Sequence, residues 1–145
     1  MLNRSLLPFA LILGAVPLAA QAPFTIRVQQ GNNVANISDG GTITMAADAL
    51  GTPTSASITV TYTGTATSVT INTLDFTGSL DFSVSGTPDF PATLNRNQSF
   101  TFGATYRPSV SLRQTGRIAF NYTQDRTTAN VIINLVGASP EFAFS

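Results

Sequence analysis

Residues 81–137 read DFSVSGTPDFPATLNRNQSFTFGATYRPSVSLRQTGRIAFNYTQDRTTANVIINLVG, and this stretch decides the fold class. Three segments within it, residues 98–108, 115–123 and 129–137, alternate apolar and polar side chains with the two-residue period of a β-strand. Clusters of Gly, Pro, Asn and Asp separate the segments and are typical of turns. Short alternating strands at this spacing predict a β-sandwich.

The chain from residue 24 onward continues the same pattern. Residues 57–63 show the cleanest alternation, with Thr between apolar positions. In residues 68–76 the apolar positions switch from odd to even near Asn72-Thr73, which predicts a β-bulge. Residues 86–97 read as a loop with two prolines. We therefore predict an all-β sandwich of about seven to nine strands, formed by residues 24–28, 42–45, 57–63, 68–76, 80–84, 100–106, 118–122 and 131–137.

The apolar faces of these strands predict the hydrophobic core. Each large side chain that is fully buried contributes roughly 1.5–3 kcal/mol. The chain has no Cys and therefore no disulfide, so this burial must offset nearly all of the conformational entropy that the chain loses on folding. The predicted core residues are Ile58, Val60, Tyr62, Phe82, Phe100, Phe102, Tyr106, Ile118, Phe120, Val131, Ile133 and Leu135.

Residues 1–22 have the pattern of a secretory signal peptide. Arg4 supplies the positive charge, an apolar run follows, and small residues end it at Ala22. The run is too short to span a membrane, which needs about 20 apolar residues. Because Pro23 would disfavour cleavage after Ala22, cleavage after Ala20 is the alternative; an uncleaved N-terminal anchor is less favoured. We expect a secreted, periplasmic or cell-surface protein without a stable membrane span after cleavage.

The composition excludes most catalytic chemistry. The chain has no His, Cys or Lys, so no Ser-His, Cys-His or Ser-Lys nucleophile can be assembled, and no thiolate metal site. Asp75, Asp81 and Asp89 are the candidates for a carboxylate pair, but Asp is common in turns and we favour that role. A calcium site at Asp39, Asp75 or Asp81 lacks the spaced carboxylates that calcium prefers. We predict no enzyme, no catalytic residue, no cofactor and no metal.

Charge and aromatic content also limit the partners. After the signal peptide, six Arg oppose six Asp and Glu141 without clustering, so no basic surface for nucleic acid is expected. The chain has no Trp, and Tyr62, Tyr106 and Tyr122 fall on predicted inward faces rather than on a sugar-stacking platform. Exposed strand edges are the remaining candidate surface, with Arg27, Arg117 and Arg126 as charged residues that could guard them.

Residues 139–145 repeat the way the domain opens. Ser-Pro-Glu-Phe-Ala-Phe at 139–144 resembles Ala-Pro-Phe-Thr-Ile at 22–26, about one domain length earlier. The segment is either the first strand of a further module or an irregular C-terminus. The predicted organisation is therefore a signal peptide (1–22), a sandwich domain (23–138) and a tail (139–145).

Six short motifs in the decisive stretch resemble those of the ASH/hydin-type domain, which is called the choice-of-anchor D type in bacterial secreted proteins. They are DFSVSG (81–86), PATL (91–94), QSF (98–100), YRP (106–108), GRI (116–118) and LVG (135–137). The resemblance covers roughly residues 24–137. Tyr62 stands where the family usually has Asn, and residues 95–97 replace an expected Pro-Gly.

The resemblance implies an immunoglobulin-like sandwich without family catalytic residues. Pro108 would end a strand because it has no N–H, and Gly64 and Gly116 would allow tight turns. We expect a non-catalytic secreted structural or interaction module, a spacer or docking domain at a bacterial cell envelope. The alternative is a ligand-binding module, for example for envelope polysaccharide. Exposed aromatic residues on one sheet face would favour the alternative, and a smooth Thr/Ser face the spacer or docking domain. The partner would be a protein at a strand edge or a neighbouring module.

Overall fold

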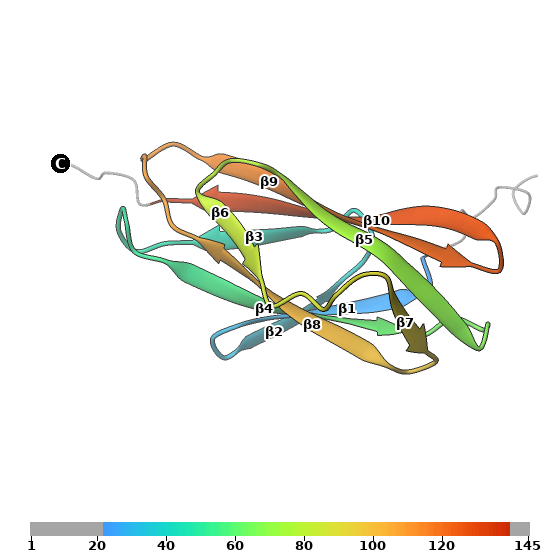
Figure 1. Ribbon diagram of the computed structural model, residues 1–145. Helices are drawn as coiled ribbons and strands as arrows, with labels where there is room; N and C mark the ends of the chain where they lie inside the picture. Colours follow the sequence, from blue (N-terminus) through green and yellow to red (C-terminus); the bar gives the residue numbers. More distant parts are fainter. Residues whose placement is uncertain (1–21, 140–145) are drawn as a thin grey trace, which may run out of the picture.

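The structure, a computed structural model, describes residues 22–139 as an all-β, immunoglobulin-like sandwich of two five-stranded sheets (Figure 1). Residues 1–21 of the predicted signal peptide and residues 140–145 of the predicted tail lie outside the described part. Within residues 22–139, no helix is long and apolar enough to cross a membrane.

The two sheets draw their strands from along the whole domain. Pairing is antiparallel throughout, except that β3 runs parallel to β10. The first sheet has the order β2 (Asn33–Ile37), β1 (Phe24–Gln30), β4 (Thr54–Tyr62), β8 (Ser99–Tyr106) and β6 (Phe82–Ser85). The second has the order β3 (Thr42–Ala46), β10 (Thr127–Ala138), β9 (Gln114–Gln124), β5 (Ser68–Gly78) and β7 (Ala92–Asn95).

The core lies between the sheets, where the alternation of each strand places its apolar side chains. Every residue of the predicted core is buried, from Phe100 at 7% exposure to Tyr62 and Phe120 at 0%. Additional core residues come from β1, β3 and β5, including Ile26, Met45 and Ile71. Phe24 and Phe100 each meet the ring of Phe120 edge to face, with centroids 5.2 and 5.9 Å apart, so aromatic packing joins the two sheets.

The predicted bulge in β5 is confirmed. Ile71 pairs with Tyr122 and Thr73 pairs with Asn121, so Asn72 is the extra residue. The side-chain amide of Asn72 donates hydrogen bonds to Asn121 Oδ1 (2.7 Å) and Thr123 Oγ1 (3.0 Å), which hold the bulged backbone against β9. The bulge ends the two-residue alternation of β5 and starts it again one position later.

The strand count exceeds the predicted seven to nine because two short edge strands carry no alternating pattern. In β2, four of five residues are exposed, so no apolar face appears in the sequence. The strand β7 lies inside the predicted loop 86–97 and has one buried residue, Leu94. Strands this short are identified by their hydrogen-bonded pairing in the structure, because their sequences show no hydrophobic pattern.

Two residue assignments were wrong. The sequence pattern predicts Leu80 in a strand with Phe82, but Leu80 lies in the turn before β6 and is 96% exposed. The family resemblance predicts a tight turn at Gly116, but Gly116 lies inside β9 opposite Gly78 and Leu135. A Cβ on Gly116 would meet the rings of Phe76 at 2.8 Å and Phe82 at 3.2 Å, so this glycine makes room for packing and not for a turn.

Candidate interaction surfaces

The aspartates considered for catalysis lie on three different segments, in structural or exposed positions. Asp81 precedes β6, and its carboxylate accepts hydrogen bonds from the Ser109 amide (2.9 Å) and hydroxyl (2.8 Å). Asp89 lies in the β6–β7 connection, in agreement with a turn or loop role. Asp75 was expected in a turn but lies exposed within β5, opposite Ala119. The carboxylate of Asp81 thus fastens the β8–β9 connection, and Asp75 lies on the exposed face of β5.

The Asp39-Gly40 turn was the candidate for a calcium site, and its groups form hydrogen bonds with the backbone of β10. Asp39 Oδ1 accepts a hydrogen bond from the Ile132 amide at 2.7 Å, and the Gly40 amide donates to the Ile132 carbonyl at 2.7 Å. These bonds fasten the β2–β3 connection to β10. Within residues 22–139, no three His, Cys, Asp or Glu side chains lie close enough to hold a metal ion.

The three tyrosines lie in the core, as predicted. Tyr62 donates its hydroxyl to the Ala66 carbonyl at 3.0 Å. Burial raises the pKa of Tyr106, and the negative charge of nearby Asp81 raises it further, while the Ser139 hydroxyl lowers it. Burial and the charge of Asp39 likewise raise the pKa of Tyr122. None of the three forms an exposed platform for stacking on a sugar ring.

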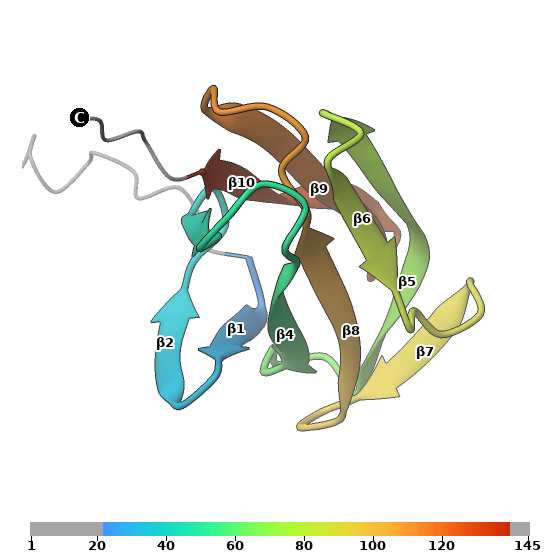
Figure 2. The same cartoon turned by 90° about the vertical axis from the view of Figure 1, so that its left-hand side faces the viewer.

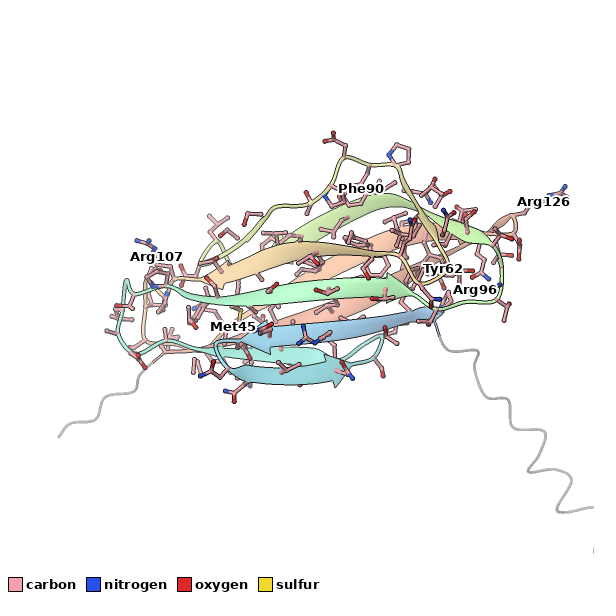
Figure 3. The ribbon with its side chains drawn as sticks, turned by 90° about the horizontal axis from the view of Figure 1, so that it is seen from below. Met45, Tyr62, Phe90, Arg96, Arg107 and Arg126 are labelled. Carbon is pink, nitrogen blue, oxygen red and sulfur yellow. The ribbon has the colours of Figure 1, made fainter. Side chains whose placement is uncertain are left out.

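One sheet face is covered with hydroxyl groups. The outward side chains of β4, β8 and β6 are Ser or Thr except at Gly103, and we call this surface the hydroxyl face. Three cross-strand pairs join β4 to β8: Ser55–Thr105 at 3.1 Å, Thr59–Thr101 at 3.0 Å and Thr61–Ser99 at 2.7 Å. Figure 3 looks onto this side, with the labelled arginines at the ends of the molecule. The members of the hydroxyl face are Ser55, Ser57, Thr59, Thr61, Ser83, Ser85, Ser99, Thr101 and Thr105.

Gly103 leaves a shallow hollow in the hydroxyl face. The hollow measures about 620 Å³, and Ser57, Ser85 and Gln29 contribute polar groups to its lining. A Cβ on Gly103 would meet the Ser85 hydroxyl at 3.6 Å, an ordinary contact, so a small side chain can be accommodated here. The lining residues carry no formal charge: the polar groups of the hollow are hydroxyl, amide and backbone groups, and Ala56 and Phe102 add apolar lining.

The edge strands are β2 and β6 in the first sheet and β3 and β7 in the second (Figure 2). The Gln30 amide donates to the Thr44 carbonyl at 3.1 Å, which occupies part of the β3 edge. Pro91 comes directly before β7, and both β6 and β7 have only four residues. The β2 edge has neither feature: it has five residues, no charge, and Val34 exposed at 49%.

The predicted charged guards do not lie on edge strands. Arg27 lies on β1 opposite Asn36, one strand in from the edge. Arg117 lies on the central strand β9, and Arg126 lies in the β9–β10 turn with a positive φ of 71°. The hydrophobic pattern does not predict β2, because its residues do not alternate. The Gly31-Asn32 turn directly after β1 was the signal for a hairpin partner strand.

Comparison with solved structures supports the fold. The VesB protease of Vibrio cholerae is similar with a TM-score of 0.59 and 16% identity over 68% of this chain, a match that covers only 30% of the protease. The ASH/PapD-like domain 7 of human CEP192 matches at 0.49 with 12% identity over 88% of this chain and 94% of that domain. A FixG-related protein of Vibrio parahaemolyticus matches at 0.44 with 14% identity over 80% and 97%.

No protein-family model and no curated protein matches the sequence. The matches to CEP192 and to the FixG-related protein have TM-scores below 0.5, so neither is used to assign the fold. The likeness to VesB has a higher TM-score, but at 16% identity it shows a shared fold and nothing about activity. The strand topology and this likeness together show an immunoglobulin-like β-sandwich.

Proposed function

We propose that this chain is a non-catalytic structural or interaction module, a spacer or docking domain secreted to a bacterial cell envelope. The hydroxyl face is the observation that carries the proposal. It presents uncharged, mutually hydrogen-bonded Ser and Thr side chains where a ligand-binding sheet would present aromatic or charged groups. Such a face is well solvated and offers little to a specific partner, which leaves the strand edges for docking.

The resemblance to the ASH/hydin or choice-of-anchor D type supports the same role. Residues of the motifs have structural roles in this fold. The rings of Phe82 and Tyr106 stack with centroids 4.8 Å apart. The strand β8 ends at Tyr106, two residues before Pro108. Gly137 lies against the ring of Tyr106. Residues that define the motif therefore pack the sandwich, which agrees with a module whose identity depends on shape and not on a reactive site.

The docking role is testable by photo-crosslinking in the producing bacterium. A photoreactive phenylalanine analogue would replace Val34 on the β2 edge, Ser83 on the β6 edge or Thr59 on the hydroxyl face. We expect protein adducts from at least one edge position and none from Thr59, with the protein recovered in the envelope or secreted fraction. Adducts that form only at Thr59, or a protein retained in the cytoplasm, would contradict the proposal.

The absence of catalysis is testable with the purified protein. A screen for glycosidase, esterase and peptidase activity should give rates equal to the buffer alone. An activity that copurifies with the chain and disappears in Asp75→Asn or Asp81→Asn would show that a carboxylate chemistry exists after all.

A ligand-binding module for envelope polysaccharide is the second candidate, and the hollow over Gly103 is the observation that favours it. A bound saccharide could exchange hydrogen bonds with Ser57, Ser85 and Gln29. Gly103→Val would place a branched apolar side chain in the hollow. If envelope polysaccharide binds the parent protein in calorimetry and not this variant, the ligand-binding function replaces the spacer function.

A further inference from the structure

The β2 strand has an open backbone edge whose direction follows from its hairpin. Gln30 and Asn33 flank the two-residue turn, and in such a hairpin the closing pair exchanges both backbone hydrogen bonds. Hydrogen-bonded and non-hydrogen-bonded pairs alternate along an antiparallel ladder. Ala35 therefore bonds toward β1, whereas the N–H and C=O groups of Val34 and Asn36 point outward, away from the sheet.

We propose that two copies of this chain pair through their β2 edges, antiparallel about a twofold axis at Ala35. In this register Val34 of one copy faces Asn36 of the second copy in a hydrogen-bonded pair, and the symmetry repeats that pair. The first sheets of the two copies become one continuous sheet. The inference rests on the proposed docking role of the strand edges and names a second copy of the chain as the partner.

The side chains fit this register. The two Ala35 residues form the non-hydrogen-bonded pair at the axis, where Cα atoms approach to about 4.5 Å and a small side chain avoids a clash. Val28 pairs with Ala35 in each copy, so an apolar row of Val28, Ala35 and their symmetry mates crosses the junction. On the other face, Val34 gains Asn36 of the second copy as a neighbour and loses exposed apolar area.

Charge does not oppose the pairing. The β2 strand has no charged residue, and residues 23–145 carry six Arg against six Asp and Glu141, a net charge of −1, so two copies repel each other little at long range. Arg27 is the charged residue of the β1–β2 hairpin. In the paired sheet the two Arg27 side chains are three strand spacings apart, about 14 Å, which exceeds the Debye length of about 8 Å at physiological salt.

The interface is short, and the association is correspondingly weak. A five-residue strand buries less than the roughly 1,000 Å² expected of a stable interface. Pairing is therefore favoured when many copies are held close together, as on a surface, because the effective concentration rises. A covalent trap is the suitable probe for such a contact.

The test uses the full chain, which has no native Cys, with one cysteine introduced on β2. Ala35→Cys places two thiols across the axis within the Cα range of a disulfide, about 4.4–6.8 Å. Asn33→Cys is the matched control on the same strand and face. Because Asn33 faces Ile37 of the second copy, its two thiols lie about four residues, or 13 Å, apart along the strands.

Under a mild oxidant, we expect Ala35→Cys to form covalent dimers at least about tenfold faster than Asn33→Cys. Equal rates would show random collision and overturn the proposal. Val34→Lys added to Ala35→Cys should slow dimer formation, because the two lysines become diagonal neighbours about 7–8 Å apart. Ser83→Lys on the β6 edge should leave the rate unchanged. Melting curves of each variant confirm that the fold is intact.

The outcome separates this inference from the proposed function. If Ala35→Cys fails to cross-link while the photoreactive group at Ser83 still gives adducts in cells, self-pairing is wrong and the docking role stands. If dimers form but neither edge gives adducts to another protein, the chain associates with itself alone.

Discussion

Gly137 and Tyr106 show how single residues set the packing at one end of the sandwich. A Cβ on Gly137 would overlap the Tyr106 ring, which is fully buried and stacked on Phe82. At Gly103, in contrast, a Cβ would make only ordinary contacts, the nearest with the Ser85 hydroxyl at 3.6 Å. We therefore expect a side chain to be tolerated at Gly103 and not at Gly137.

Gly137→Ala should destabilise the domain by about 1–3 kcal/mol, the cost of overpacking a filled core. Gly103→Ala should change the free energy of unfolding by less than about 0.5 kcal/mol. Urea unfolding of both variants measures the difference. Equal effects would mean that the Tyr106 ring can move away from Gly137.

The buried tyrosines predict a loss of stability in alkali. Burial raises the pKa of Tyr106 and Tyr122, so in the folded state both keep their protons at a pH where the unfolded chain loses them. The folded state then binds more protons, and the free energy of unfolding falls as the pH rises above about 10. We expect Tyr106→Phe to show a shallower fall than the parent in urea unfolding between pH 9 and 11.5, about the range of ordinary tyrosine titration. An identical slope would exclude the raised pKa.

The predicted core phenylalanines allow a direct check of the inward faces. Phe100, Phe102 and Phe120 are exposed by 7%, 2% and 0%, so Phe→Ala at each should cost about 3–5 kcal/mol in urea unfolding. Phe120, which meets two rings of the opposite sheet, Phe24 and Phe100, should show the largest loss. A cost below about 1 kcal/mol at Phe120 would contradict its position between the sheets.

At the scale of elements, the bulge of β5 decides which side chains face the core. Val69 and Ile71 are buried before the bulge, whereas Leu74 and Phe76 pack against the core after it. Because Asn72 is one extra residue, the apolar side chains before and after the bulge lie on the same face of the sheet, toward the core.

Asn72→Ala should cost about 0.5–1.5 kcal/mol, because it removes two side-chain hydrogen bonds but keeps the extra residue. Deletion of Asn72 should be far more damaging, since the residues on one side of the bulge would change faces. Thermal unfolding followed by circular dichroism compares the two. A deletion variant as stable as Asn72→Ala would show that β5 can shift its register freely.

At the scale of the whole molecule, the two sheets are joined across both sides by short connections. Residues 38–41 lead from the β2 edge to the β3 edge, and residues 86–91 lead from the β6 edge to the β7 edge (Figures 1 and 2). Each sheet is thus fastened to the other where its edge strands end, and β10 ends at Ala138 with its pairing to β3 and β9 complete.

Residues 141–145 are predicted to lie outside the core of this domain, because they repeat its opening pattern one domain length later. Their deletion should leave the melting temperature nearly unchanged. Differential scanning calorimetry of the shortened and full chains tests this. A decrease of several degrees would mean that the tail contributes a strand to the sandwich.

The sequence by itself determined the fold class, the core and the bulge. Each depends on local alternation: a residue such as Phe100 has polar neighbours on both sides, Ser99 and Thr101, and that pattern has one favourable arrangement in a two-layer sheet. The exclusion of His-, Cys- and Lys-dependent chemistry also needed composition alone.

Only the tertiary structure decided which surfaces are available. Two features join residues that are tens of positions apart: the parallel pairing of β3 with β10, and the hydroxyl pairs between β4 and β8. The exposure of β2 likewise depends on where the other strands of the sheet lie. Gly116 shows the same limit at one residue, since its neighbours Phe76 and Phe82 come from other strands. Edge exposure is a property of long-range contacts, and β2 has no alternating pattern of its own, so the Gly31-Asn32 turn is its local signal.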